Sequence, residues 1–387
     1  MPPTVHGLTL PRALSDIAPS AAVAFGAAVF VALLLVRATR GQPRGPQVHG
    51  RTARLHPPRI GGLAILAGFL AGLAHRIAVS SDDPDRALLA AVVALLPVAG
   101  SGLAEDLTGR VGPRQRLFWM FAGALCLTAS GAVLLQRTAV PPLDAALTFV
   151  PLAAVFTAFA CVGAANAFNL VDGLDGMLAG TALLTLGAIS WVALSVGDPW
   201  VAATAMLLAA AVLGWMPFNW PRAALFCGDG GAYAIGFLCA VLLLLLVARH
   251  PQVSPWFGIT AAALPVWETL YSIARRVRSG RSTLEPDRAH LHHLVRDRMG
   301  GLFSAGACSE AEGRPRGAGA AVPPAGPNGC ASPVLWALHG AAVVGGAAWF
   351  DDTDAQLCVF VGFVLAYVAA YSLLRRAGRS ARAAVAG

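Results

Sequence analysis

The polar residues of this 387-residue chain that could bind a metal ion or a phosphate fall into short clusters between long apolar stretches. Carboxylates that lie close together repel one another unless a divalent cation joins them. Oxygen ligands without cysteine favour Mg²⁺ over zinc, with Mn²⁺ as the alternative. The clusters therefore predict a Mg²⁺ site. Its acidic candidates, which we also expect to form the catalytic set, are Glu105, Asp106, Asp172, Asp175 and Asp229.

Two basic or glycine-rich segments add groups that suit a phosphate. Residues 275–278 read Arg-Arg-Val-Arg, and one guanidinium group can bind two phosphate oxygens at the same time. Residues 228–231 read Gly-Asp-Gly-Gly at the start of an apolar stretch, where free backbone N–H groups could meet an anion. Mg²⁺ is commonly held by one or two carboxylates plus substrate phosphates. Together these segments predict a Mg²⁺–diphosphate site. In a membrane-embedded enzyme, such a site would take one soluble and one lipid substrate.

Each cluster also has a simpler interpretation when taken alone. Adjacent acids at a helix end are commonly solvated, and Asn, Asp and Gly are ordinary turn formers. An Asp between glycines can cap a helix, and three histidines in four residues can form a surface group. The site hypothesis therefore depends on the clusters lying on one face of the membrane.

The composition predicts that this face belongs to an all-α polytopic membrane protein. The chain is 57% hydrophobic and 12% charged, against about 25% charged for a soluble protein. A helix that crosses a bilayer needs about 20 apolar residues. Eleven stretches qualify, which predicts about eleven transmembrane helices: 17–36, 60–79, 87–104, 117–135, 145–165, 177–196, 200–217, 231–248, 256–274, 334–350 and 355–373.

The arginines indicate the orientation of these spans. The alternate loops that contain the polar clusters hold 23 of the 28 basic residues, and the opposite loops hold five. Basic residues favour the cytoplasmic side, so we expect the N-terminus outside, the C-terminus in the cytoplasm and the site at the cytoplasmic face. Topology also accounts for the net charge of +8, so we expect no nucleic acid as a partner.

Two further features of the composition exclude classes of protein. All basic residues are Arg, and without Lys there is neither a P-loop nor a Schiff-base enzyme. The seven cysteines form no C-x-x-C pair, which argues against a disulfide framework or a zinc–cysteine site. We expect a single domain over 1–387 with a long cytoplasmic loop at 275–333. Its Gly/Ala/Pro-rich part, 301–333, is expected to be flexible.

The clusters resemble those of a known enzyme family. The segments P-R-I-G-G at 58–62, Glu-Asp at 105–106, N-A-F-N-L-V-D-G-L-D-G at 166–176, G-D-G-G at 228–231 and P-D-R-A-H-L-H-H at 286–293 occur in the family's order. The family is that of the polyprenyl-phosphate N-acetylhexosamine-1-phosphate transferases, also called glycosyltransferase family 4. The resemblance covers about Arg51 to His293. It is nearer to the branch that transfers N-acetylglucosamine 1-phosphate to undecaprenyl phosphate than to the branch that transfers phospho-N-acetylmuramoyl-pentapeptide in peptidoglycan synthesis.

The resemblance implies a reaction and its partners. A sugar-1-phosphate would pass from a UDP-N-acetylhexosamine to undecaprenyl (polyprenyl) phosphate, with release of UMP. This would be the first membrane step of a cell-surface polysaccharide such as lipopolysaccharide O-antigen. The protein would lie in the bacterial inner membrane, in contact with lipid, and a homodimer is left open.

The resemblance also implies roles for individual residues. Asp229 would be the principal Mg²⁺ ligand, the 166–176 segment would lie at the nucleotide and diphosphate end, and Glu105 and Asp106 near the lipid phosphate. The implied substrate-binding residues are Asn166, Asn169, Arg275, Arg276, Asp287, Arg288, His290, His292 and His293.

Several positions depart from the family pattern. Glu105 replaces an Asp, Ala232 a Ser and Leu284 an aromatic residue, while Glu268 stands where the family has the Asp of a P-x-x-D pattern. Successive helical residues point about 100° apart, so Glu105 and the following Asp could share one ligand only if a helix ended between them. The following Leu-Thr-Gly favours such an end.

Two other classes of function stay open at this point. A transporter or lipid flippase would place ionisable residues near the middle of the bilayer, whereas these spans are nearly free of them. A scaffold without catalytic activity would explain the departures from the family pattern. Release of UMP from a UDP-sugar would separate an enzyme from both.

Overall fold

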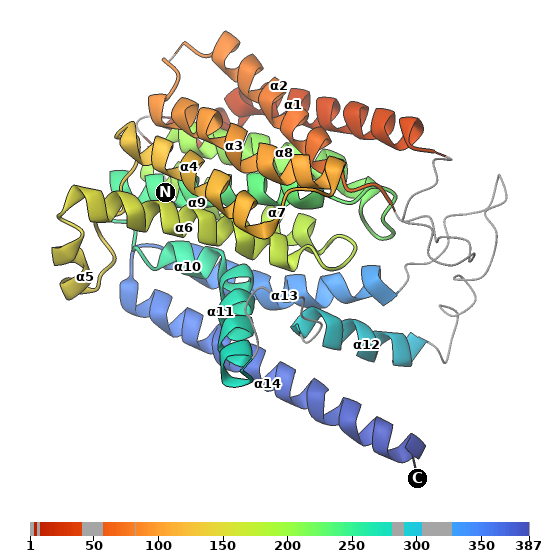
Figure 1. Cartoon of the computed structure of the whole chain (residues 1–387). Helices are drawn as coiled ribbons and strands as arrows, with labels where there is room; N and C mark the ends of the chain where they lie inside the picture. The colour runs from red at the N-terminus through yellow and green to blue at the C-terminus, as the bar shows by residue number, and fades with distance from the viewer. Residues whose placement is uncertain are drawn as a thin grey trace.

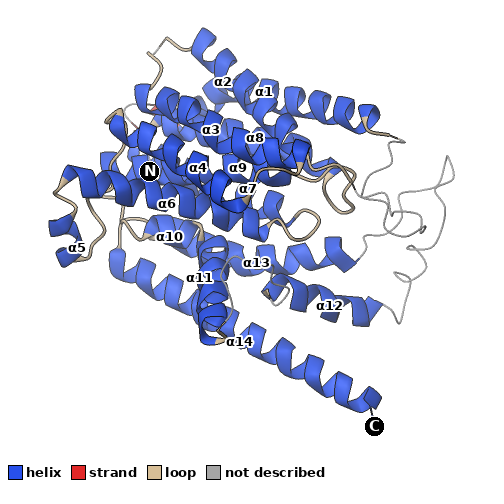
Figure 2. Ribbon diagram, in the orientation of Figure 1, coloured by secondary structure: helices blue, strands red, loops and turns tan. Residues whose placement is uncertain are grey.

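The structure, a computed structural model, describes residues 4–5, 8–40, 57–81, 83–280, 290–303 and 327–386, and the described chain is almost entirely helical (Figure 2). A two-residue antiparallel pair, β1 (Thr4–Val5) and β2 (Leu8–Thr9), precedes the helices. The prediction of an all-α polytopic membrane protein is confirmed. The helices are α1 (Leu10–Ala38), α2 (Gly61–Val79), α3 (Arg86–Thr108), α4 (Pro113–Ala129), α5 (Pro141–Ala146), α6 (Val150–Val171), α7 (Met177–Val196), α8 (Pro199–Trp215) with the 3₁₀ turn η1 (Met216–Phe218), α9 (Gly228–Arg249), α10 (Phe257–Ala261), α11 (Ala263–Arg278), α12 (Leu291–Phe303), α13 (Pro327–Ala348) and α14 (Thr353–Ala386).

Within the described residues, nine helices are long and apolar enough to cross a membrane, against about eleven spans expected from the sequence. The expected span at 117–135 falls largely in α4, whose 17 residues rise only about 25 Å. The expected span at 256–274 is divided into α10 and α11 at Ala262. Both stretches are largely helical, so the difference lies in length and continuity. The predicted loop 301–333 is also helical at both ends, in α12 and α13.

The bundle helices run between two ends, which we name the Asp229 end and the Arg249 end. At the Asp229 end α2, α4, α7 and α9 begin, while α3, α6 and α8 finish. At the Arg249 end, Arg249 of α9 donates to Asp85, the N-cap of α3, at 2.5 and 2.9 Å. It also donates to Asp198, the N-cap of α8, at 3.3 Å. This ion-pair network fixes the register of three helices.

Helix α9 forms the centre of the bundle (Figure 1). Every residue from Gly228 to Val247 is buried, and the helix packs against α2, α3, α6, α7 and α8. Its sequence is compatible with this position, because a helix that is apolar on all sides can be surrounded by other helices, and its glycines allow them to approach closely. The one charge in its buried part, Asp229, lies in the first turn.

Glycines bring the backbones of α2, α3 and α9 into direct contact at the Asp229 end. A Cβ atom on Gly62 of α2 would lie 2.5 Å from the Gly231 nitrogen, and one on Gly102 of α3 would lie 2.5 Å from the Gly230 nitrogen. Gly228 has a φ of +80° and faces the carbonyl oxygen of Arg59. Small residues allow such close approach between membrane helices, and only glycine fits here.

The second half of the broken helix, α11, leaves the direction of the bundle. The break frees the carbonyl of Ala261, which accepts a hydrogen bond from the Thr185 hydroxyl at 2.8 Å, so the freed group is satisfied inside the protein. Helix α11 then runs crosswise to the bundle helices and passes α14 (Figure 1). Leu270, Ile273 and Val277 share its outer face and are exposed. Its inner face meets α6, α13 and α14.

The glycine contact predicts that Gly102→Ala destabilises the protein. An added methyl group must push α3 away from α9, and overpacking of this kind costs about 1–3 kcal/mol. Gly100→Ala is the matched control, because Gly100 lies in the same helix with nothing within 4 Å of its Cβ position. Thermal unfolding in detergent is expected to show a lower melting temperature for Gly102→Ala alone. Equal melting temperatures for the two variants would contradict the close contact.

Candidate active site

Asp229 lies at the centre of a group of charged side chains at the Asp229 end. It is buried in the first turn of α9, where a carboxylate also meets the positive end of the helix dipole. Arg59, just before α2, donates to Oδ1 of Asp229 at 2.8 Å, and Arg116, in the first turn of α4, pairs with Oδ2. The Arg59 side chain is 60% exposed, so its guanidinium joins buried carboxylates to the surface.

Asp106 belongs to this group, whereas Glu105 turns away from it. Oδ2 of Asp106 accepts a hydrogen bond from the Gly230 N–H at 2.9 Å, and its Oδ1 forms a 3.7 Å ion pair with Arg59. Oε2 of Glu105 accepts from the Val111 N–H at 2.7 Å and so holds the turn between α3 and α4. The expectation of a helix end between the two acids is wrong. Helix α3 continues to Thr108, so the pair diverges.

Asp172 and Asp175 lie on the turn between α6 and α7. Oδ2 of Asp175 accepts from the Ala223 N–H at 3.2 Å, and Asn219 accepts from the Gly176 N–H at 2.8 Å, so the segment after α8 fixes this turn. Burial raises the pKa of the Asp175 carboxyl, although the bond from Ala223 and the charge of Arg222 oppose the shift.

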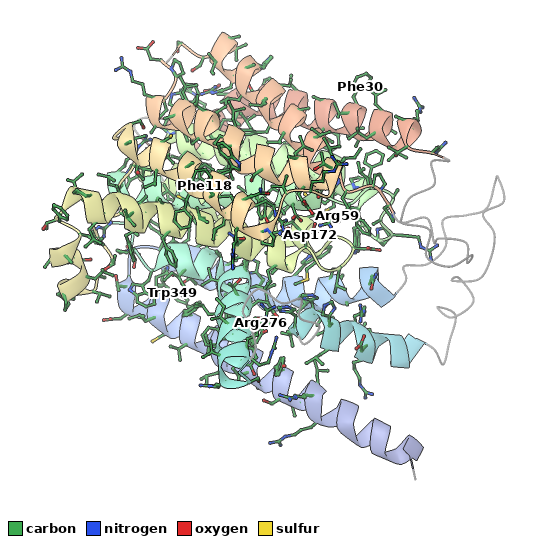
Figure 3. All side chains as sticks on the ribbon, viewed as in Figure 1. Phe30, Arg59, Phe118, Asp172, Arg276 and Trp349 are labelled. Atoms are coloured by element: carbon green, nitrogen blue, oxygen red, sulfur yellow. The ribbon has the colours of Figure 1, made fainter. Side chains whose placement is uncertain are left out.

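Asp172 is the titratable group of this turn with the largest shift. Burial raises the pKa of Asp172 to about 7; the charge of Arg59 opposes this rise, and those of Asp106 and Asp175 add to it. Figure 3 shows Arg59 and Asp172 close together at the Asp229 end. Asp172 is therefore electrostatically coupled to the Arg59 group and can exchange a proton near neutral pH.

The two asparagines lie along α6, one and two turns before Asp172. The Asn166 amide donates to the Val162 carbonyl at 2.9 Å and lies 4.0 Å from the sulfur of Met120, so it faces α4. Asn169 is partly buried, and its backbone carbonyl accepts a hydrogen bond from the Asp172 backbone N–H at 3.2 Å. Both precede the turn on the same side of the helix.

The three histidines pack at the start of α12, against the same turn. His290 and His292 are buried and stack with ring centroids 5.2 Å apart, and the centroids of His292 and His293 are 4.2 Å apart. A Cβ atom on Gly173 would collide with Nε2 of His292. Burial, followed by the neighbouring cations, lowers the pKa of His292 well below its usual value and also lowers that of His293. The structure thus joins the histidine cluster to the Asp172 turn.

The arginines of α11 lie apart from this group. Arg275 donates to the Tyr371 hydroxyl of α14 at 3.0 Å and lies over the rings of Tyr271 and Tyr371. Figure 3 shows Arg276 on α11, separated from Arg59 and Asp172. The expected substrate residues Asp287 and Arg288, together with Leu284, lie outside the described residues.

Three residues of the site were not among the sequence candidates. Arg59 and Arg116 hold Asp229, and Asn219 holds the turn at Gly176 through a side chain that is buried. A signal existed for the first two, since Arg59 lies within P-R-I-G-G and Arg116 in a short polar loop. The acidic clusters predict a metal site, but they do not indicate which arginine pairs with each acid. Asn219 gives no comparable signal.

The donors at the Asp229 end fit a hard divalent cation. Oδ1 of Asp106 is buried and accepts no hydrogen bond, and its ion pair with Arg59 is 3.7 Å long, so a cation beside it would give this oxygen a closer partner. Asp229 adds a second carboxylate linked through Arg59. Across the described residues, no group of three or more His, Cys, Asp or Glu is arranged as a complete metal site.

Comparison with known proteins gives one consistent set of relatives. The profile of glycosyl transferase family 4 matches residues 88–247. The chain is 28% identical over 258 residues (66% of this chain, 68% of the relative) to a probable undecaprenyl-phosphate N-acetylglucosaminyl 1-phosphate transferase of Bacillus subtilis. It is 29% identical over 280 residues (62% and 66%) to decaprenyl-phosphate N-acetylglucosaminephosphotransferase of Mycobacterium leprae. It is also 29% identical over 247 residues (62% and 65%) to undecaprenyl-phosphate alpha-N-acetylglucosaminyl 1-phosphate transferase of Yersinia pestis. The chain thus spans about two thirds of the length of these relatives.

The raised pKa of Asp172 predicts how Asp172→Asn changes stability with pH. In the folded protein the Asp172 carboxyl keeps its proton up to about pH 7, whereas in the unfolded chain it loses that proton near pH 3.8. The wild type therefore loses stability as the pH rises between these values. At pH 8 the variant lacks the ionised carboxylate, and its free energy of unfolding is expected to exceed that of the wild type by about 1–3 kcal/mol.

This difference is expected to shrink at pH 5. Chemical denaturation in detergent without divalent cations, followed by tryptophan fluorescence, measures it, and Asp83→Asn at an exposed acid serves as the control. A gain as large at pH 5 as at pH 8 would contradict the shift.

Proposed function

The chain belongs to glycosyl transferase family 4, the polyprenyl-phosphate N-acetylhexosamine-1-phosphate transferases, and on that premise we propose that it transfers a sugar-1-phosphate from a UDP-sugar to a polyprenyl phosphate. The observation that carries the proposal is the Arg59–Asp229–Arg116 cluster with Asp106, at one end of a membrane bundle and beside the Asp172 turn. This arrangement holds positive charge in a fixed position next to buried carboxylates. Two phosphates are both anions, so they need such positive charge in order to approach each other.

The reaction exchanges one P–O bond for another. An oxygen of the lipid phosphate attacks the phosphorus that carries the sugar, the bond from that phosphorus to the bridging oxygen breaks, and UMP leaves with the bridging oxygen. A phosphate monoester has its second pKa near 6, so the attacking group is mostly dianionic at neutral pH and needs little help from a base. We therefore favour direct displacement over a covalent intermediate on a carboxylate.

Charge neutralisation is then the main task of the protein. Phosphoryl transfer depends mostly on positioning and on electrostatic stabilisation. The guanidinium of Arg59 is largely exposed and can meet a substrate oxygen while it stays paired with Asp229 and Asp106. Arg116 is more buried and keeps Asp229 in place. Asp229 and Asp106 would hold Mg²⁺, or Mn²⁺ in its place. The ion would neutralise charge on the diphosphate.

The sugar nucleotide is assigned to the side where the Asp172 turn meets the histidines. His292 packs on Gly173 between Asp172 and Asp175, so groups for a diphosphate and for a sugar lie on adjoining elements. An N-acetylhexosamine is the proposed sugar, with N-acetylglucosamine first among the candidates. The three relatives are named for transfer of that sugar phosphate to undecaprenyl or decaprenyl phosphate.

The proposed setting is the bacterial inner membrane, with the Asp229 end in the cytoplasm, where UDP-sugars are made. The arginine excess on the loops at that end supports this orientation. The lipid phosphate would then reach the site from the cytoplasmic leaflet, and the N-terminus would lie outside.

The experiment that tests this function is UMP release by the purified protein. A panel of UDP-sugars is supplied with undecaprenyl phosphate and Mg²⁺. We expect UMP from at least one UDP-N-acetylhexosamine only when the lipid phosphate is present, together with a lipid-diphosphate sugar. UMP formation that does not depend on the lipid, or no UMP from any sugar, would reject the proposal.

Asp229→Asn is expected to reduce turnover by at least about 100-fold, because it removes the charge that pairs with both guanidiniums and that would bind the cation. The Mg²⁺ concentration that gives half-maximal activity should rise for any residual turnover. The control is Asp351→Asn, which changes an exposed acid at the Arg249 end and should behave as the wild type. Near-normal activity of Asp229→Asn at ordinary Mg²⁺ would show that the metal assignment is wrong.

Cysteine labelling tests the orientation in a background without native cysteines. Thr108→Cys places an exposed thiol at the Asp229 end and Gln252→Cys places one at the Arg249 end. A maleimide that does not cross membranes should label only the Gln252→Cys variant in intact spheroplasts, and both variants after lysis. Labelling of the Thr108→Cys variant from outside would reverse the proposed topology.

A further inference from the structure

Glu268 is a buried carboxylate outside the residues assigned to the reaction. It lies in the second turn of α11, and its side chain is 1% exposed. Its Oε1 lies 2.9 Å from Nδ1 of His290 and accepts from the Leu291 backbone N–H at 3.1 Å. Its Oε2 accepts from the Tyr367 hydroxyl at 2.8 Å. A buried carboxylate is costly unless hydrogen bonds satisfy it, and three donors surround this one.

The donors come from two other elements of the fold. Tyr367 belongs to α14, while His290 and Leu291 form the start of α12. The first N–H groups of a helix have no partner within the helix, and a side chain commonly satisfies one of them. Glu268 does this for Leu291 from a different helix. It therefore fixes where α12 begins and how His290 is oriented.

From His290 the contact continues to the Asp172 turn. The ring of His290 stacks on that of His292, with an angle of 2° between the planes. His292 in turn packs against the backbone of Gly173, directly after Asp172. Glu268, His290 and His292 thus form a continuous path from α11 to the turn assigned to the diphosphate.

We propose that Glu268 is a positioning residue for the sugar-nucleotide side of the active site: its Oε1 accepts the Nδ1 proton of His290, fixes that ring in one tautomer and leaves Nε2 as the nitrogen available to the substrate. The inference rests on the proposed function, because it takes the histidine cluster to be part of the sugar-nucleotide site.

The tautomer follows from the donors around Glu268. Oε1 of Glu268 acts as an acceptor, since it accepts from the Leu291 N–H, and when it accepts from His290 as well, Nδ1 of His290 carries the proton. In a neutral imidazole with a proton on Nδ1, the lone pair is on Nε2, which then accepts hydrogen bonds. Such a nitrogen suits a hydroxyl or amide N–H of an N-acetylated sugar. The rings of His292 and His293 of α12 lie beside that of His290, and the Tyr367 hydroxyl of α14 contacts the other oxygen of Glu268.

A purely structural role is the rival explanation. Through Tyr367, Glu268 also links α11 to α14, and loss of that link could lower activity without any effect on His290. Three substitutions in the full-length chain separate the two roles. Glu268→Gln keeps an acceptor oxygen, Glu268→Met keeps the length without an acceptor, and Tyr367→Phe removes only the link to α14.

The direct readout is the tautomer of His290. Protein labelled with ¹⁵N-histidine is examined in detergent at pH 8.5, and His290→Asn identifies the signal. We expect Nδ1–H in the wild type and in Glu268→Gln, and loss of this preference in Glu268→Met.

The kinetic readout is kcat/KM for the UDP-sugar. It is expected to fall about tenfold or more in Glu268→Met, and to stay within about threefold of the wild type in Glu268→Gln and Tyr367→Phe. In a His290→Asn background, Glu268→Met should add less than about a twofold loss, because both substitutions remove the same contact.

Three outcomes would overturn the proposal. The first is that Glu268→Met keeps the Nδ1–H tautomer. The second is that Tyr367→Phe loses as much activity as Glu268→Met. The third is that the losses from Glu268→Met and His290→Asn multiply. If the wild type releases UMP from no UDP-sugar, the proposed function fails, and the tautomer measurement still decides whether Glu268 orients His290.

Discussion

The buried charge of Asp229 is the constraint on which the Asp229 end depends. A carboxylate in the first turn of a helix that is otherwise apolar must be neutralised where it lies, because the helix cannot rotate it toward water. Arg59 and Arg116 provide this neutralisation from the segments that begin α2 and α4. Glycines allow the backbones of α2, α3 and α9 to approach closely enough for Asp106 to reach the N–H of Gly230. Charge balance and helix packing are therefore one arrangement, and its exposed edge, at Arg59, is where we propose that phosphates bind.

The absence of lysine gives this arrangement a particular character. A guanidinium is planar, carries several donors and stays charged at any physiological pH, whereas an ammonium is a compact charge that burial can neutralise. Arg59 uses that geometry to contact two carboxylates, through Nη2 and Nε, while most of its side chain faces outward. The positive charge offered to a substrate is thus held in a fixed position by the same acids that would bind a cation.

The sequence was sufficient for the type of fold and for the choice of segments, and insufficient for the directions of side chains. Apolar length predicts helices well, since burial in lipid or protein requires backbone hydrogen bonds within each segment. It did not predict the break at Ala262, because a neighbouring helix satisfies the freed carbonyl there. Their adjacency predicts that Glu105 and Asp106 act as a pair, yet α3 continues past them and turns their carboxylates apart. The role of Arg116 could not be predicted, because its partner Asp229 is 113 residues away in the sequence.

Contact between glycine backbones also limits how this molecule can move. Side chains can change rotamer to let helices slide, but where Gly62 and Gly102 meet the start of α9 no side chains stand between the main chains. On the other side of the fold, α11, α12 and α14 meet through side chains, by the hydrogen bonds around Glu268 and by the packing of Trp267 against Tyr367. Main-chain contact thus joins α2, α3 and α9, whereas side-chain contact joins α11, α12 and α14, and a bulky lipid chain that needed extra room could gain it only where side chains make the contact.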